Sequence, residues 1–241
     1  MFSDFLMKPV AHIRTAFPEK FGIPRQSGYV PELKGQVIFE PEYRNPDALR
    51  GLEEYSHIWL VWIFSQSIRE EWSPTVRPPR LGGNQRKGVF ATRSPFRPNP
   101  IGLSSVRLES VEWDGPEGPV IHVSGVDLMD GTPILDIKPY VVFSDSHPDA
   151  SGSFAQAALG HRLKVIIPDH LLDKIPAEYQ KAVQEVLALD PRPAYQNDPE
   201  RIYGFSFAGM EIRFRVQEDV LNVEAICSMS SGAVAKSKAD G

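Results

Sequence analysis

The sequence predicts a mainly β protein in which a small β-barrel domain is followed by a smaller α+β domain. Short segments rich in β-branched and aromatic residues, separated by turns rich in Gly and Pro, fill the chain up to about residue 145. The second half has one long amphipathic helical pattern, followed by three segments in which apolar residues alternate. Six short strands spaced by turns are typical of a closed or nearly closed barrel.

The strands expected in the first half are 36–40, 57–64, 88–92, 103–108, 120–126 and 134–137. The longest apolar run, 58–64, reads as a buried strand, because its seven residues fall short of the about 20 that a membrane helix needs. A helix is expected over 46–55, where apolar residues recur at helical spacing. Small and Pro-rich residues at 144–153 indicate a linker, so the first domain is expected to span 1–148.

In the second half, an apolar stripe predicts an amphipathic helix that begins near Pro176 and ends at Asp190. Alternating apolar residues then predict a three-stranded meander with turns at 208–209 and 218–219. We therefore expect a small α+β domain over 155–227. The residues at 228–241 are small and polar, as in a disordered tail.

The composition narrows the class of protein. With 41% hydrophobic residues the chain can bury a packed core, and its single cysteine, Cys227, excludes an internal disulfide, which fits a reducing compartment. The N-terminus lacks the pattern of a signal peptide, so we expect a cytoplasmic protein without a membrane span. The six histidines show no metal-ligand spacing, so we expect no metal, and His57 and His122 are expected in the core.

Charge is distributed unevenly along the chain. Residues 72–108 contain seven Lys and Arg and no Asp or Glu, although the chain-wide frequency predicts about five carboxylates there. The other residues carry 19 basic and 31 acidic side chains, so a chain with a formal net charge of −5 contains one basic segment. This pattern predicts a polyanionic ligand such as RNA, and a merely solvated loop is the alternative.

Several familiar catalytic signatures do not occur in this sequence. There is no Gly-x-Gly-x-x-Gly or phosphate loop, and Ser104 and Ser105 lack the turn of a serine hydrolase nucleophile. Four Pro-flanked segments with embedded Gly stand out instead: 24–28, 77–84, 91–103 and 127–133. Such loops lose little conformational entropy on folding and allow a ligand to approach the backbone. Tight turns between barrel strands explain the Gly and Pro equally well, but not the concentration of Arg, Phe, Pro and Asn at 93–100.

In these segments the sequence resembles the TrmO family of β-barrel tRNA methyltransferases that use S-adenosylmethionine. The similarity runs from about Ile13 to Asp149 and rests on the strings PRQSG, RGLEEYSHIWL, TVRPPRLGGN, GVFATRSPFRPNPIGLS and DLMDGTPILDIKPY. In the second domain only 189–195 is a sharp match. The resemblance implies N6-methylation of threonylcarbamoyladenosine at position 37 next to the anticodon. It also implies a homodimer whose active sites lie near the subunit boundary.

The cofactor contacts implied by the resemblance fall on eleven residues: Gln26, Ser27, Gly28, Phe64, Ser65, Arg93, Leu103, Asp127, Leu128, Met129 and Asp130. Ser65 departs from the family, in which this position is often His. Carboxylate and aromatic groups suit the cationic sulfonium of S-adenosyl-L-methionine, and an arginine suits its carboxylate. Turn capping is the alternative role for Asp127 and Asp130.

The remaining candidates concern the acceptor. We expect Asp136 or Tyr140 to remove, or to orient the removal of, the proton on the acceptor nitrogen, and a structural role in the barrel wall is the alternative for Tyr140. Six residues are expected to hold the tRNA anticodon stem-loop: Arg77, Arg80, Arg86, Lys87, Phe96 and Arg97. Arg192 is a further candidate. Two other functions stay open, a non-catalytic RNA-binding barrel and a methyltransferase of the same fold with a different small acceptor.

Overall fold

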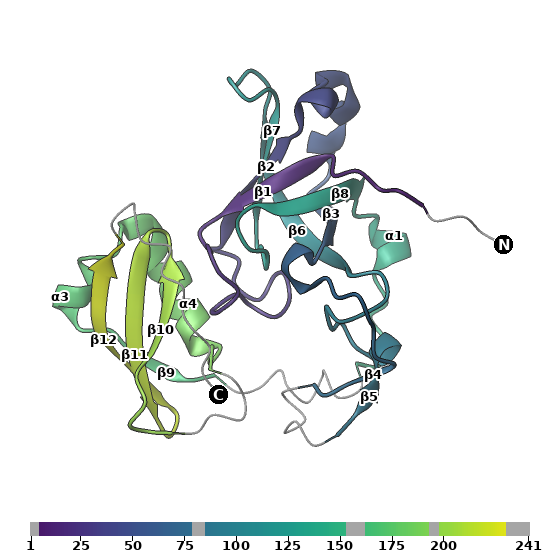
Figure 1. The fold of residues 1–241 in the computed structure, drawn as a ribbon. Coiled ribbons are helices and arrows are strands. Elements are labelled where there is room, and N and C mark those ends of the chain that lie inside the picture. Colours follow the sequence, from purple (N-terminus) through teal and green to yellow (C-terminus); the bar gives the residue numbers. More distant parts are fainter. Residues whose placement is uncertain (1–4, 79–84, 153–161, 193–197, 230–241) are drawn as a thin grey trace.

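The first half of the chain forms a closed barrel of six strands (Figure 1). The computed structural model describes residues 5–78, 85–152, 162–192 and 198–229. The barrel strands follow one another in the order β1-β2-β7-β6-β3-β8, and every neighbouring pair is antiparallel. They are β1 (Ala11–Thr15), β2 (Lys34–Phe39), β3 (His57–Ile63), β6 (Ile101–Glu112), β7 (Val120–Ser124) and β8 (Thr132–Pro139). The predicted barrel is confirmed.

Strand β3 shows how the sequence pattern becomes a barrel wall. Successive side chains point to opposite faces of a strand, so Ile58, Leu60 and Trp62 are buried while the residues between them are half-buried. The apolar run is therefore buried on one face only. The same alternation makes the prediction of core histidines wrong. The His57 ring lies 2.9 Å from the Ser56 hydroxyl, and the half-exposed His122 ring lies 3.2 Å from a carboxylate oxygen of Glu112.

Two elements expected in the first half are different in the structure. Instead of a barrel strand over 88–92, the short β5 (Lys87–Gly88) pairs with β4 (Thr75–Val76) outside the barrel, and a 3₁₀ helix (Val89–Ala91) follows. The sixth barrel strand is β1. Instead of one helix over 46–55 there are two 3₁₀ helices, Pro46–Leu49 and Leu52–Glu54. Gly51 lies between them at φ +85°, a left-handed conformation that ends the first helix.

Short helical turns also occur at the ends of strands. A 3₁₀ helix, Pro41–Tyr43, follows β2, and another, Ser65–Ser67, follows β3. Helix α1 (Val142–Asp145) follows β8 and occupies the start of the segment expected as a linker.

The second domain is a four-stranded sheet with helices. Its strands are β9 (Lys164–Ile166), β10 (Tyr203–Phe207), β11 (Met210–Gln217) and β12 (Val220–Ser228), in the order β10-β11-β12-β9. The predicted meander is confirmed, and β9 adds a parallel strand to it. Helices α3 (Asp169–Leu172) and α4 (Ala177–Ala188) precede the meander, and α4 is the predicted amphipathic helix. The predicted tail was 228–241, but Ser228 is the last residue of β12, and residues 230–241 lie outside the described residues.

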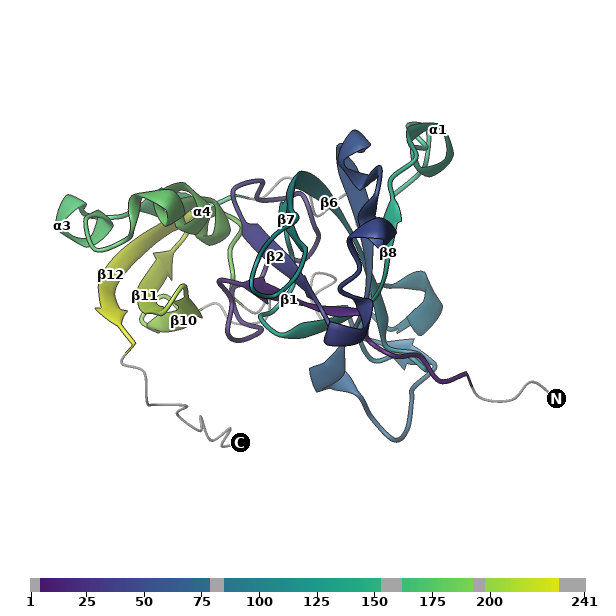
Figure 2. The ribbon, with the colours of Figure 1, turned by 90° about the horizontal axis from the view of Figure 1, so that it is seen from above.

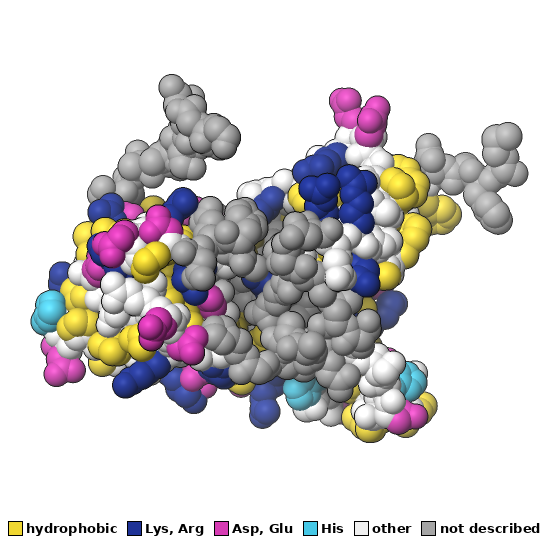
Figure 3. Space-filling view, turned by 90° about the horizontal axis from the view of Figure 1, so that it is seen from below, with side chains coloured by type: hydrophobic (Ala, Val, Ile, Leu, Met, Phe, Trp, Pro, Cys, Tyr) yellow, Lys and Arg dark blue, Asp and Glu magenta, His cyan; other side chains and the backbone are white. Residues whose placement is uncertain are grey.

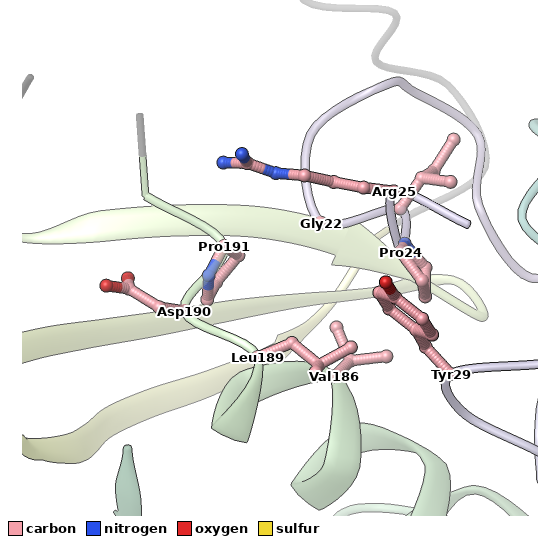
Figure 4. Close-up of a pocket in the computed structure, with 9 residues that line it drawn as sticks. Gly22, Pro24, Arg25, Tyr29, Val186, Leu189, Asp190 and Pro191 are labelled. Carbon is pink, nitrogen blue, oxygen red and sulfur yellow. The ribbon is translucent and has the colours of Figure 1, made fainter. Parts of the chain in front are cut away.

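The two domains share a continuous apolar core. The Phe17 and Phe207 rings meet edge to face at 5.0 Å, and the Ala208 amide donates to the Ala16 carbonyl at 2.8 Å. Figures 1 and 2 both place α4 beside the loop that follows β1. A hollow of about 40 Å³ remains at the seam, between Tyr29 and Pro24 on one side and Val186 and Leu189 on the other (Figure 4). This is far below the about 300–1,000 Å³ of small-molecule sites, so the seam is a packing joint.

Candidate active site

A cleft of about 680 Å³ opens at one end of the barrel, and its volume suits a small-molecule ligand. Four parts of the chain line it: the loop after β1, the end of β3 with the turn after it, the segment leading into β6, and the turn before β8. Three of the four unusual Pro- and Gly-containing segments, 24–28, 91–103 and 127–133, therefore meet here. Of the fourth, residues 79–84 lie outside the described residues, and 77–78 do not line the cleft.

Eight of the eleven predicted cofactor residues line this cleft: Gln26, Phe64, Ser65, Arg93, Leu103, Asp127, Leu128 and Met129. The other three lie next to it in the chain. The Ser27 backbone N–H donates to the Asp127 carboxylate, and the Gly28 N–H donates to the Gly125 carbonyl at 2.8 Å. An oxygen of Asp130 accepts from the Thr15 amide at 3.0 Å, which is the turn-bracing role given above as the alternative. The cofactor roles themselves stay predictions.

The floor of the cleft contains a buried hydrogen-bonded chain. The Trp62 indole N–H donates to the Ser104 hydroxyl at 3.0 Å, and this hydroxyl donates to a carboxylate oxygen of Asp127 at 2.6 Å. Ser104 is 1% exposed. Burial raises the pKa of Asp127 from 3.8 to about 6, although hydrogen bonds from Ser104, from its own backbone and from Ser27, and the nearby charge of Arg93, act to lower it. A carboxyl group held in this way titrates close to neutral pH and suits a cationic ligand.

A glycine on the neighbouring strand makes room for Trp62. Residues Trp62 and Gly102 are partners across the β3–β6 ladder, and a Cβ atom at Gly102 would lie 2.3 Å from Cε2 of the indole. The Phe64 ring lies 4.2 Å from the Trp62 ring, centroid to centroid. The cleft floor is therefore aromatic beside the buried carboxyl group of Asp127.

Cations line the cleft above this floor. Arg93 donates to the side-chain oxygen of Gln26, which joins the segment before β6 to the loop after β1. Arg97 donates to the Thr92 carbonyl at 3.2 Å, and Lys20 donates to the Gln66 carbonyl at 2.9 Å. The site thus combines one buried acidic group with several cations, an arrangement that fits a ligand with separate positive and negative ends.

The predicted proton-removing residues do not line this cleft. The Asp136 carboxylate lies 2.8 Å from the Lys138 ammonium group on β8. The Tyr140 ring packs against Trp59 at 5.6 Å and His57 at 6.3 Å, which is the wall position given as its alternative. A role of either residue in proton removal stays a prediction.

The predicted RNA-binding residues lie mainly beyond the cleft. Arg97 lines it, whereas Arg77, Arg86 and Lys87 lie in or beside strands β4 and β5, and Arg80 lies outside the described residues. The face in Figure 3 shows Lys and Arg side chains gathered beside exposed hydrophobic ones, with acidic side chains at the edge of the group.

Arg192, the further candidate for RNA binding, lies in an ion pair, and a role in RNA binding stays a prediction. Its guanidinium group donates to both carboxylate oxygens of Asp190, at 2.8 and 2.9 Å, and its side chain is only 9% exposed. The signal in the sequence was the short Asp-Pro-Arg spacing, which lets the two side chains pair within one turn.

Sequence reasoning missed Trp62 and considered Ser104 only as a hydrolase nucleophile. A tryptophan in a buried strand needs a partner for its N–H, and that rule is the signal that would have pointed to this pair. Within the described part of the chain, no group of three or more His, Cys, Asp or Glu side chains could hold a metal ion. The described helices are too short or too polar to span a bilayer.

Both domains match family models. Residues 12–146 match the tRNA-methyltransferase O N-terminal domain, and residues 162–228 match the TrmO C-terminal domain. The tRNA (adenine(37)-N6)-methyltransferase of Escherichia coli K12 is 42% identical over 232 residues, which cover 93% of this chain and 98% of that protein. A Pseudomonas aeruginosa protein named as an S-adenosylmethionine-dependent methyltransferase is 40% identical over 86% of this chain and 91% of its own. A crystal structure of TrmO from Pseudomonas aeruginosa matches with a TM-score of 0.77 at 33% identity, covering 95% of this chain and 99% of that one.

Proposed function

Because the chain belongs to the tRNA-methyltransferase O family, we propose that it transfers the methyl group of S-adenosylmethionine to N6 of adenosine 37 in tRNA. The observation that carries this proposal is the cleft at the end of the barrel, with one buried carboxyl group on its floor and cations around it. A substrate in tRNA also makes the cytoplasm the place of action.

We propose that the donor lies in the cleft with its sulfonium toward Asp127. The cationic sulfonium would be attracted to this carboxylate and to the faces of Trp62 and Phe64. Arg93 would hold the carboxylate of the methionine part, as a guanidinium group suits a carboxylate. The other predicted cofactor residues supply the shape of the pocket, through the backbone of 26–28 and 127–130.

We propose that the acceptor is the threonylcarbamoyl form of adenosine 37. The threonyl group carries a carboxylate, and the cations Lys20 and Arg97 on the cleft lining suit an anionic substituent there. The nitrogen of a carbamoyl-substituted adenine has a delocalised lone pair, so it must lose its proton as it attacks. The C–N bond forms as the C–S bond breaks, and the sulfonium becomes a neutral thioether.

Positioning of the two reactants contributes most to the rate of such a displacement. Holding the methyl carbon and the nitrogen in line can lower the barrier by about 7–11 kcal/mol. Proton removal adds roughly 10²- to 10⁴-fold. Neither Asp136 nor Tyr140 lines the cleft of its own chain, so in the homodimer that we propose this role falls to the copy of one of them on the partner subunit.

Mixed dimers test this arrangement. A chain with Asp127→Asn and a chain with Asp136→Asn, each inactive by itself, are expected to regain activity when combined, because one cleft then has both groups. In a second experiment, the Asp127→Asn chain is combined with a Tyr140→Phe chain in the same way. Full activity of Asp136→Asn and Tyr140→Phe alone would exclude both residues as the proton acceptor.

The activity itself is tested by tritium transfer. Donor labelled in its methyl group is incubated with the protein and with bulk tRNA from a strain lacking the enzyme, and the nucleosides are then separated. We expect the label in N6-methylated threonylcarbamoyladenosine. Label in another adenosine would refute the threonylcarbamoyl acceptor while keeping the methyltransferase. Tight tRNA binding without saturable binding of the donor would instead favour a non-catalytic RNA-binding barrel.

A further inference from the structure

The cleft continues into an arm that stands away from the barrel. The arm consists of two segments, 64–76 and 87–101, which leave the ends of β3 and β6 (Figure 1). They are joined at the base by a hydrogen bond from the Phe64 amide to the Pro100 carbonyl at 2.8 Å, and further out by one from the Val89 amide to the Pro74 carbonyl at 2.9 Å. Strands β4 and β5 pair at the far end.

The base of the arm is one wall of the cleft. Both of its segments contribute lining residues, 64–67 from the first and 93–101 from the second. If a nucleotide of an RNA lies in the cleft, the nucleotides adjoining it in the RNA therefore lie next to the outer part of the arm.

Two large aromatic side chains lie exposed on this outer part. Trp72 is 54% exposed and Phe90 is 73% exposed, and their ring centroids are 6.3 Å apart with a tilt of 35° between the planes. A third ring, Phe96, lies in the segment 93–101 that lines the cleft, and the Arg69 guanidinium group lies 3.8 Å from its centroid. Clustered exposed aromatic rings mark a binding surface rather than a packed core.

The charges around the rings favour a nucleic acid. Arg77, Arg86 and Lys87 lie between Trp72 and Phe90 in sequence and form no salt bridge with any residue that the structure describes, and Arg86 lies 3.4 Å from the Thr75 hydroxyl. Glu70 and Glu71 directly precede Trp72 in the first segment of the arm, and no acidic residue follows from Trp72 to Leu108. Aromatic rings for bases, interleaved with cations for phosphates, are the two components of sites for single-stranded nucleic acid.

We propose that Trp72 and Phe90 form a stacking platform for unpaired bases of the anticodon loop that adjoin the methylated adenosine. This proposal rests on the proposed function, because it takes the adenosine to enter the cleft. A base must leave its stack to enter a closed-in site, and this uncovers the faces of its neighbours. The two rings replace that lost stacking, and they do so for any base, since every base has a flat π face.

The test compares stacking with charge. A fluorescein-labelled RNA hairpin with the loop of an anticodon stem-loop is titrated with the full-length protein, and a fully paired RNA duplex is titrated in parallel. In the variant with Trp72→Ala and Phe90→Ala, affinity for the hairpin is expected to fall about 5- to 150-fold for each base that loses its partner. Affinity for the duplex, and the slope of hairpin affinity against salt, are expected to stay the same, because no cation is removed.

Three controls accompany this variant. Trp72→Phe with Phe90→Tyr keeps the rings and is expected to bind the hairpin like the wild type. Ile202→Ala removes a similarly exposed apolar side chain, 51% exposed, from the other domain, and is expected to change nothing. Circular dichroism and saturable donor binding establish that each variant is folded.

The outcomes are separable. Wild-type affinity for the hairpin in the double alanine variant overturns the platform, even if methyl transfer by the wild type succeeds. An equal loss for hairpin and duplex also overturns it, because the rings would then not distinguish unpaired bases. If the double variant changes the sedimentation coefficient, the rings belong to an interface with a second copy and the platform is wrong. Failure of tritium transfer by the wild type would refute the proposed function, whatever the hairpin shows.

Discussion

Replacing the buried carboxyl group of the cleft has a predictable effect on stability. Asp127→Asn removes a charge and keeps the shape of the side chain. In the folded protein burial raises the pKa of Asp127 from 3.8 to about 6. Since one pKa unit corresponds to about 1.36 kcal/mol, ionised Asp127 destabilises the fold by about 3 kcal/mol at neutral pH. Its folded-state pKa is the higher one, so the destabilisation by Asp127 is absent below about pH 3.8, grows as the pH rises to about 6, and is constant above.

Denaturant unfolding without donor measures this effect. At about pH 7.5 we expect the free energy of unfolding of Asp127→Asn to exceed that of the wild type by up to about 3 kcal/mol, and at about pH 4.5 we expect the difference to shrink. Donor binding should change in the opposite direction. Calorimetry should show wild-type affinity for S-adenosylmethionine falling by about tenfold per pH unit below about 6, because the carboxylate is then protonated. The variant should bind weakly at every pH.

One result would refute the reasoning. If Asp127→Asn is no more stable than the wild type at about pH 7.5, and if its donor affinity is unchanged, then Asp127 is neither destabilised by burial nor a partner of the sulfonium. If the variant is instead more stable but binds the donor normally, burial does destabilise ionised Asp127, but Asp127 is not a partner of the sulfonium. Binding sites commonly contain groups that lower stability but are needed for function. The free energy of unfolding and the donor affinity measure these two effects of Asp127 separately.

Three further predictions concern the scaffold of the site. Ser104→Ala removes a hydrogen bond that holds the pKa of Asp127 down, so calorimetry across pH should show donor binding lost at a higher pH than in the wild type. Gly102→Ala places a methyl group 2.3 Å from the indole of Trp62 and should lower the free energy of unfolding by about 1–3 kcal/mol. Asp190→Asn weakens the ion pair with Arg192 and should destabilise the protein by about 1.5–3 kcal/mol, with hairpin affinity unchanged. A weaker hairpin complex in the last variant would contradict the structural role of that pair.

The barrel was largely predictable because its strands alternate apolar and polar residues along the chain. Strand β1 was missed because it is short and gains its stability from non-local pairing, with β2 on one side and β8 on the other. The segment 88–92 has strand-like residues but no barrel neighbour, so only its first residue, Gly88, pairs, with Thr75 of the arm. Local propensity predicts a strand poorly where pairing with a partner strand determines whether the strand forms.

The site was predictable only to the extent that its residues lie in distinctive strings. Eight residues named from the family resemblance meet in one cleft, although they come from loops about a hundred residues apart. The network of Trp62, Ser104 and Asp127 depends on the β3–β6 register, which a single sequence does not contain. Asp136 was named for its chemistry, and its position on β8 directs it away from the cleft.

The second domain supports one wall of the cleft. The loop after β1 carries Gln26, and the second domain contacts this part of the chain on both sides of that residue. Before it, the Ser206 amide donates to the Glu19 carboxylate at 3.0 Å, and the Phe205 ring packs so closely on Gly22 that a Cβ there would lie 2.7 Å from it. After it, Lys181 of α4 pairs with Glu32. Since Gln26 in turn accepts the hydrogen bond of Arg93, the packing of the second domain is transmitted to a cation of the cleft. The small α+β domain thus contributes to the site by fixing the loop that shapes it.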